Sequence, residues 1–147
     1  MRSVFICAVA VLVSWPVFAR PKLSECDGYA EKSRELGCSN RGYLLKFGYR
    51  YCREFVRRND DFTEFGQDVL AKIRRCLLDK IETEPGLTCR NVKSKAQDHH
   101  VECYVKSGYC ELNLGDKWTI ADIVWDELND PGFEDTTNRI LDECKIL

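Results

Sequence analysis

The sequence predicts an all-α domain of about five to six helices, held together by disulfide bonds. Between its glycines and prolines, the chain repeats apolar residues at intervals of three and four, as one face of a helix does. Most segments show this period rather than the strict alternation of a β-strand. Eight cysteines follow residue 19, and such an even number is typical of a disulfide framework in a small exported domain.

The first nineteen residues have the features of a secretory signal peptide. Arg2 supplies a positive start, residues 4–15 supply an apolar run, and Val17 and Ala19 are the small residues that precede cleavage. We therefore expect a secreted, extracellular protein whose single domain comprises residues 20–147. No later run approaches the ~18 consecutive apolar residues of a membrane span, so we expect no membrane insertion.

Helix boundaries follow from breakers and caps. Gly37 should end the first helix, and Gly48 weakens the second because glycine lowers helix propensity. Thr88 can cap the fourth helix, Asp116 can open the fifth, and Pro131 should end the fifth. The expected helices cover residues 22–36, 42–56, 62–81, 88–109, 116–128 and 134–145.

The third helix has the clearest pattern. Asp60 and Asp61 can cap it, since acidic side chains are favourable at the positive end of a helix, and Pro85 stops it. Its apolar stripe consists of Phe62, Phe65, Val69, Ile73, Cys76, Leu77 and Ile81. In the fifth segment the corresponding stripe contains Trp118, Ala121, Val124, Trp125 and Leu128, and we expect it to face the core.

The cysteines lie on the apolar faces of these helices. Cys103 and Cys110 are two turns apart, about 10.5 Å, which is beyond the ~7 Å that a disulfide spans between Cα atoms. Each should therefore bond a different neighbour, but eight cysteines alone leave 105 pairings open. No C-x-x-C pair is present, so we expect neither structural zinc nor another cofactor.

The charge distribution favours no nucleic-acid partner. The net charge is −2, and residues 111–147 carry ten acidic side chains against three basic ones. A nucleic-acid-binding protein would need a broad basic face. Five arginines form a candidate basic surface for an acidic partner, with solvated helix faces as the plainer interpretation. They are Arg53, Arg57, Arg58, Arg74 and Arg75.

No catalytic residues can be assigned. His99 and His100 precede a Cys-Tyr pair, as the catalytic histidine does in secreted phospholipases A2. However, no aspartate follows His100 and no glycine-rich calcium loop is present, so water could not be activated for ester attack. The chain also lacks a G-x-S-x-G elbow and a phosphate-binding G-x-x-x-x-G-K loop. We therefore expect a protein that is not an enzyme.

Four short motifs and the cysteine spacing resemble the stanniocalcin family. The motifs occupy residues 51–55, 62–66, 73–76 and 102–106, and the resemblance covers about Cys38 to Cys144. Stanniocalcins are secreted, helical, hormone-like glycoproteins linked to calcium and phosphate homeostasis, and they can inhibit pappalysin metalloproteases. The resemblance implies a regulator that binds an extracellular protein target or receptor, such as a metalloprotease.

The same resemblance implies a set of disulfides. Matched positions give Cys76–Cys103 and Cys110–Cys144, and the other four cysteines fit best as Cys26–Cys52 and Cys38–Cys89. Relatives link two subunits through a further cysteine that this chain lacks. We therefore expect any homodimer, and any inhibition of a protease, to be noncovalent.

Two other functions stay open. A helical extracellular carrier of small apolar ligands would be similar to insect odorant-binding proteins, although these have a C-x-x-x-C step that is absent here. A secreted calcium-dependent esterase would have to depend on His100.

Overall fold

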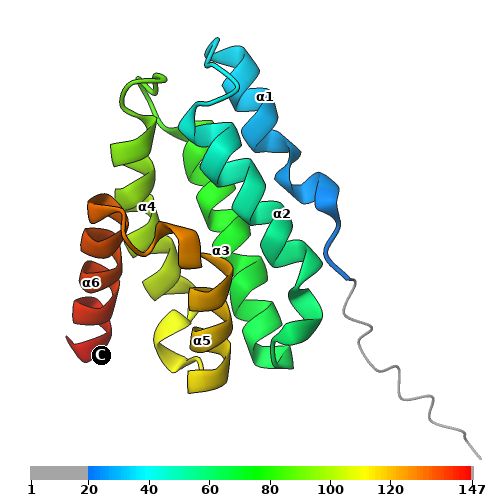
Figure 1. Cartoon of the computed structure of the whole chain (residues 1–147), viewed down its shortest axis with the longest axis vertical. Helices are drawn as coiled ribbons and strands as arrows, with labels where there is room; N and C mark the ends of the chain where they lie inside the picture. Colours follow the sequence, from blue (N-terminus) through cyan, green and yellow to red (C-terminus); the bar gives the residue numbers. More distant parts are fainter. Residues whose placement is uncertain (1–19, 147) are drawn as a thin grey trace, which may run out of the picture.

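The computed structural model describes residues 20–146 and shows a bundle of α-helices (Figure 1). The α-helices are α1 (Asp27–Glu35), α2 (Arg50–Arg57), α3 (Glu64–Thr83), α4 (Val92–Ser107), α5 (Leu114–Ile123) and α6 (Pro131–Ile146). Between or before them lie the 3-10 segments η1 (Leu23–Cys26), η3 (Asn59–Asp61), η4 (Tyr109–Glu111) and η5 (Trp125–Glu127), and the π-helix η2 (Leu44–Tyr49). The predicted all-α class is confirmed, and residues 20–146 contain no strand.

The expected signal peptide, residues 1–19, lies outside the described residues. Within the part that is described, no helix is both long and apolar enough to cross a membrane.

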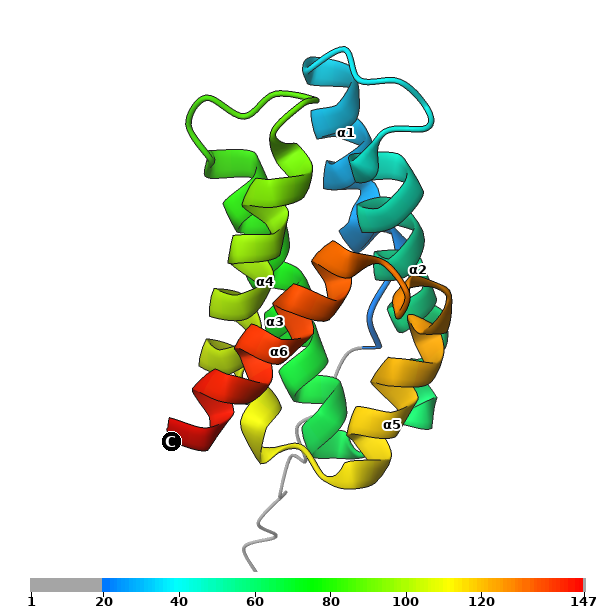
Figure 2. The same ribbon diagram turned by 60° about the vertical axis from the view of Figure 1, so that its left-hand side comes forward.

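Helix α4 packs against both α3 and α6, and α6 runs diagonally across the front of the bundle in Figure 2. The side chains form two buried clusters. One joins α2, α3 and α5 around Val69, Leu70 and Ile73. The other joins η1, α1, η2 and the facing ends of α3 and α4 around Leu44, Ile81 and Val92.

Four disulfides connect elements that are distant in the sequence. Cys26–Cys52 joins η1 to α2, and Cys38–Cys89 joins the loop after α1 to the loop between α3 and α4. Cys76–Cys103 joins α3 to α4, and Cys110–Cys144 joins η4 to α6. The Cα–Cα distances are 5.3 to 5.8 Å, and these four pairs are the ones that the stanniocalcin resemblance implies.

The start of α3 differs from the sequence expectation. Asp60 and Asp61 lie in η3 rather than at the cap, and Thr63 is the N-cap, where its hydroxyl accepts a hydrogen bond from the Gly66 amide at 3.1 Å. The reason is tertiary: the buried carboxylate of Asp116 accepts hydrogen bonds from the Thr63 amide at 3.0 Å and from its hydroxyl at 2.6 Å. Thr63 is thereby held in the extended conformation of a cap.

Helix α5 begins two residues before the expected opening at Asp116. Asn113 is its N-cap, and the Asn113 amide oxygen accepts from the Asp116 amide at 2.8 Å. Asp116 therefore lies in the first turn of α5 and also reaches the start of α3. A Cβ on Gly66 would lie 2.6 Å from an Asp116 carboxylate oxygen, so the close approach of the two helices requires glycine there.

Glycine has a similar role at position 48. A Cβ there would lie 2.6 Å from the ring of Tyr29, which is buried against η2. The segment therefore stays helical despite the low helix propensity of glycine, because close packing against α1 compensates for it.

The last two long helices are also shifted. Thr88 and Asn91 form a hydrogen-bonded turn, and α4 starts only at Val92. Pro131 begins α6 instead of stopping the previous segment, because proline lacks only an amide that the first helical turn leaves free. The Asp130 carboxylate accepts from the next amides that need a partner, those of Gly132 and Phe133.

The expected inward direction of two tryptophans is wrong. Trp118 is 70% exposed and Trp125 is 60% exposed. Helix α5 buries Ile120 and Ile123 instead, which turns Trp118 outward. In α6, Leu141 is 42% exposed, whereas Thr136 and Ile140 are buried.

Candidate functional site

A cavity of about 360 Å³ lies between η2, α4, α5 and α6. A smaller cavity of about 60 Å³ adjoins it toward α3, and the two share several lining side chains, including Phe47, His100 and Tyr104. The principal lining residues of the larger cavity are Arg41, Tyr43, Lys46, Phe47, Lys93, Gln97, His100, Tyr104, Tyr109, Lys117, Ile120, Ala121, Val124, Glu127, Asp130, Phe133, Thr137 and Ile140.

One face of α4 forms a wall of this cavity. Lys93, Gln97, His100 and Tyr104 follow one another at steps of four, three and four, which places them in a single stripe. At 1.5 Å per residue the stripe spans about 16 Å, so the cavity is elongated along the helix. The neighbouring stripe of α4, with Val92, Ala96 and Cys103, is buried.

Aromatic rings line the cavity in an unbroken series. Tyr43 stacks on Phe47 with ring centroids 5.0 Å apart, and Phe47 lies 6.1 Å from His100. His100 lies 5.8 Å from Tyr104, which in turn lies 5.3 Å from Tyr109. Such a wall offers a large apolar contact area to a ligand, with polar atoms only at the ring edges.

His100 is held neutral and in one tautomer. Its Nδ1 lies 2.6 Å from the Ala96 carbonyl oxygen, and because a carbonyl only accepts, Nδ1 carries the proton and donates it. Nε2 is then a hydrogen-bond acceptor. Burial lowers the pKa of His100, more than the Ala96 carbonyl raises it. Among residues 20–146, the hydrogen-bond partner of His100 is this backbone carbonyl rather than a carboxylate.

The tyrosine hydroxyls are also neutral. Burial raises the pKa of Tyr43 and Tyr104 well above the usual range of phenols, and it does the same for Tyr29 beneath them. The interior of the cavity thus combines apolar rings with uncharged donors and acceptors.

Charged side chains also line the cavity. Lys93 pairs with Asp130 at 2.9 Å, and Glu127 accepts from the Tyr51 hydroxyl at 2.8 Å. Lys117 donates to the Cys110 carbonyl oxygen at 3.0 Å and lies 5.5 Å from the Tyr109 ring centroid. Arg41 and Lys46 are exposed.

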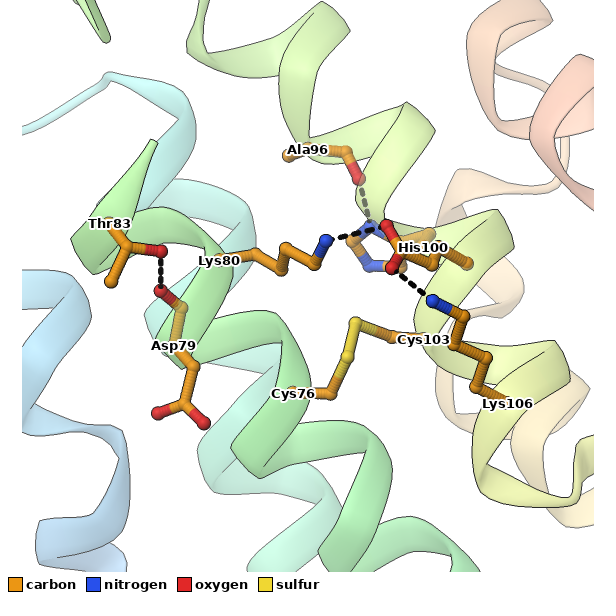
Figure 3. Close-up of a disulfide and its surroundings, with 9 residues drawn as sticks. Cys76, Asp79, Lys80, Thr83, Ala96, His100, Cys103 and Lys106 are labelled. Atoms are coloured by element: carbon orange, nitrogen blue, oxygen red, sulfur yellow. Dashed lines mark hydrogen bonds and ion pairs between the residues drawn. A yellow bond between two sulfur atoms is a disulfide. The ribbon is translucent and has the colours of Figure 1, made fainter. Parts of the chain in front are cut away.

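The opposite side of α4 is closed by the Cys76–Cys103 disulfide (Figure 3). Glu102, next to it, accepts hydrogen bonds from Lys80 of α3 and Lys106 of α4, each at 2.6 Å. Lys106 and Lys80 together lower the pKa of Glu102 to about 2. A charge-paired and covalently linked α3–α4 unit therefore supports the wall of the cavity.

The five arginines of the expected basic surface do not form one surface. Arg74 of α3 is buried, with 8% of its side chain exposed, and its Nη2 lies 3.8 Å from Glu25 Oε2. The prediction that Arg74 belongs to the basic surface is therefore wrong. Arg74 lines the smaller cavity together with Tyr29 of α1 and Gly48 of η2. Arg75 is exposed, whereas Arg58 is engaged with Asp61 and Asp122, each at 2.7 Å.

The remaining two arginines also interact within the chain. Arg57 pairs with Glu54 at 3.3 Å, and Arg53 donates to the Tyr49 hydroxyl at 2.7 Å. Charges that are already paired or hydrogen-bonded contribute little to attracting a distant acidic partner.

Sequence reasoning missed the cavity. It identified the α4 stripe that contains the cysteines but not the adjacent stripe of Lys93, Gln97, His100 and Tyr104. That stripe was visible as a helical repeat. The sequence alone does not show that α6 packs against this face of α4 and contributes Phe133 and Ile140 to the lining.

Comparisons with known proteins add no relative: no family model, curated protein or solved structure matches this chain. Fold and site define a disulfide-stapled all-α domain with an elongated aromatic cavity.

Proposed function

We propose that this chain is an exported carrier protein that binds a small apolar ligand between η2, α4, α5 and α6. The observation that carries the proposal is the cavity of about 360 Å³ with its series of aromatic rings. Ligand sites are typically cavities of ~300–1,000 Å³ with apolar walls and a few polar groups, and in helical bundles they lie between helices.

The disulfides support this proposal through rigidity. Cys110–Cys144 ties α6 to η4, and Cys76–Cys103 ties α4 to α3, so two walls of the cavity are covalently fixed. A cavity that is fixed before binding requires little ordering of side chains when the ligand enters. Four disulfides also suit an oxidising compartment, in agreement with the signal-like residues 1–19.

The proposal is tested with N-phenyl-1-naphthylamine, a neutral apolar probe that becomes fluorescent out of water. The oxidised protein should bind it with micromolar affinity at one site. Thr137→Phe should reduce that affinity at least tenfold, because Thr137 lines the cavity and a phenyl ring would fill part of it. Asn138→Phe is the matched control, since Asn138 is the next residue of α6 and is exposed.

Loss of binding in Thr137→Phe but not in Asn138→Phe supports the carrier function. Equal binding by both variants and the unchanged protein would place the probe elsewhere and contradict it. Thermal unfolding of each variant checks that the fold is retained.

A second candidate is a hormone-like regulator that resembles stanniocalcin and binds an extracellular protein. Two observations favour it. The four disulfides agree with the pairs implied by the resemblance. Leu114 and Trp118, one turn apart on α5, are 85% and 70% exposed, and exposed aromatic residues are enriched in protein interfaces.

Affinity capture from extracellular material tests this candidate. The oxidised protein should retain a metalloprotease, and purified protease should then bind it noncovalently. Trp118→Ser should abolish the interaction while leaving probe binding in the cavity unchanged. A protease that binds Trp118→Ser and the unchanged protein equally would exclude Trp118 of α5 from the interface.

A further inference from the structure

The polar groups of the cavity are concentrated where α4 begins. Lys93 and Gln97 come from the first turns of α4, and Asp130 lies beside Lys93. Arg41 and Lys46 are close to Tyr43 in the sequence, and the Cys38–Cys89 disulfide ties the start of this segment to the loop that precedes α4, which places Arg41 at the same end.

The balance of charge at this end is positive. Lys93 and Asp130 neutralise each other at 2.9 Å. Arg41 and Lys46 are exposed and make no ion pair among the described residues. The end therefore presents two cationic side chains that form no ion pair with a carboxylate of residues 20–146. Glu127 also lines the cavity, where its carboxylate accepts a hydrogen bond from the Tyr51 hydroxyl, and the charges of the lining still sum to a positive excess.

The middle of the cavity has the opposite character. His100 is neutral, Phe47 and Phe133 are apolar, and the hydroxyl of Tyr104 stays protonated. An anion buried among these groups would lose its hydration without gaining a counter-charge, which is strongly unfavourable. The other unpaired cation of the lining, Lys117, already donates to the Cys110 carbonyl oxygen and lies over the Tyr109 ring, so we expect a negative group of a ligand at Arg41 and Lys46.

The shape of the cavity limits the rest of the ligand. The stripe from Lys93 to Tyr104 runs about 16 Å along α4, and past Tyr104 the lining continues with Tyr109, Lys117, Ile120 and Ile140. A long, narrow apolar body would contact the rings one after another.

We propose that the ligand is an elongated amphipathic carboxylate, with its head group at Arg41 and Lys46 and its apolar chain along His100 and Tyr104. This inference rests on the proposed carrier function and adds the chemical class of the ligand. The head group lies near the surface, where it keeps part of its hydration, and the chain lies between α4 and α6.

The test compares decanoate with decan-1-ol as competitors of N-phenyl-1-naphthylamine. Both carry the same number of carbons, but only decanoate is charged at pH 7.5. Decanoate should displace the probe at about tenfold lower concentration than decan-1-ol at low salt. High salt should reduce this difference, because exposed charges are screened.

A double variant, Arg41→Gln with Lys46→Gln, should weaken decanoate about tenfold and leave decan-1-ol unchanged. The matched control is Lys22→Gln with Arg90→Gln, which removes the same charge from exposed residues that line neither cavity. The control should bind decanoate as the unchanged protein does.

Three outcomes separate the inference from the function on which it rests. Selective loss of decanoate in the Arg41/Lys46 variant supports the carboxylate head group. Equal displacement by decanoate and decan-1-ol, or an equal loss of both in that variant, overturns the inference while leaving the carrier function intact. Failure of the neutral probe to bind the unchanged protein overturns both.

Discussion

The two faces of α4 differ in how they are closed. The face toward α3 buries small side chains and a disulfide, with Val92 at 1%, Ala96 at 3% and Cys103 at 0% exposure. The face toward α6 carries large rings with polar edges, His100 and Tyr104, and leaves the cavity open. Small apolar residues allow two helices to pack closely without leaving a cavity, whereas large, partly polar rings hold the next helix at a distance.

The largest effect should come from removing the link on the closed face. Cys76→Ala with Cys103→Ala should lower the free energy of unfolding by about 3–4 kcal/mol, because the bond closes a loop of 27 residues and its loss enlarges the unfolded ensemble. Urea unfolding monitored by circular dichroism measures the change. A loss below 1 kcal/mol would mean that noncovalent packing alone closes this face.

A matched pair of isoleucines compares the two faces directly. Ile81→Ala, in the α3–α4 cluster at 2% exposure, should cost about 3 kcal/mol because it leaves a new void among close-packed side chains. Ile140→Ala, on α6 beside the existing cavity, should cost only about 1–2 kcal/mol, since part of its surroundings is already empty. Urea unfolding of both variants gives the difference. Equal losses of unfolding free energy in the two variants would contradict a cavity beside Ile140 of α6.

The next effect is a pH dependence that originates on the open face. Burial lowers the pKa of His100 below its usual value of 6.5, so in this range the unfolded chain binds a proton more readily than the folded protein. The free energy of unfolding should reach its full value above pH 6.5 and should decrease as the pH falls below 6.5. Each unit by which the pKa is lowered corresponds to about 1.4 kcal/mol.

Unfolding free energies between pH 7.5 and 5 measure this effect. His100→Gln should flatten the curve, because glutamine does not titrate. The lowered pKa of Glu102, about 2, adds a dependence of the same sign only near pH 5, where the unfolded carboxyl begins to bind a proton, and this contribution also remains in His100→Gln. A slope that persists in His100→Gln would assign the effect to another group.

The smallest effect should come from α5, on the outer surface of the bundle. Trp118→Ser should change the free energy of unfolding by about 0.5 kcal/mol or less, because the indole is 70% exposed and little of its surface is buried on folding. Thermal unfolding measures it. A large loss would show that Trp118 packs against the bundle in solution.

Much of the architecture was already determined by local sequence. The interval between Asp61 and Pro85 contains one long apolar stripe, and α3 follows it from Glu64 to Thr83. Gly37, with positive φ, lies just beyond α1 as expected of such a stop, whereas Gly108, also with positive φ, ends α4 at Ser107 although the helix was expected to continue to residue 109. Helical periodicity and glycine conformation are properties of neighbouring residues, so the sequence predicts them without knowledge of the rest of the fold.

Tertiary structure decided which residues cap, which are buried and where space remains. Thr63 caps α3 because Asp116, fifty-three positions later, binds it, and Arg74 is buried although its charge predicts exposure. The cavity exists because α6 packs along α4, is tied to η4 by the Cys110–Cys144 disulfide, and leaves space beside Tyr104 and His100. Contacts between distant segments depend on the geometry of the whole bundle, and no local pattern encodes them.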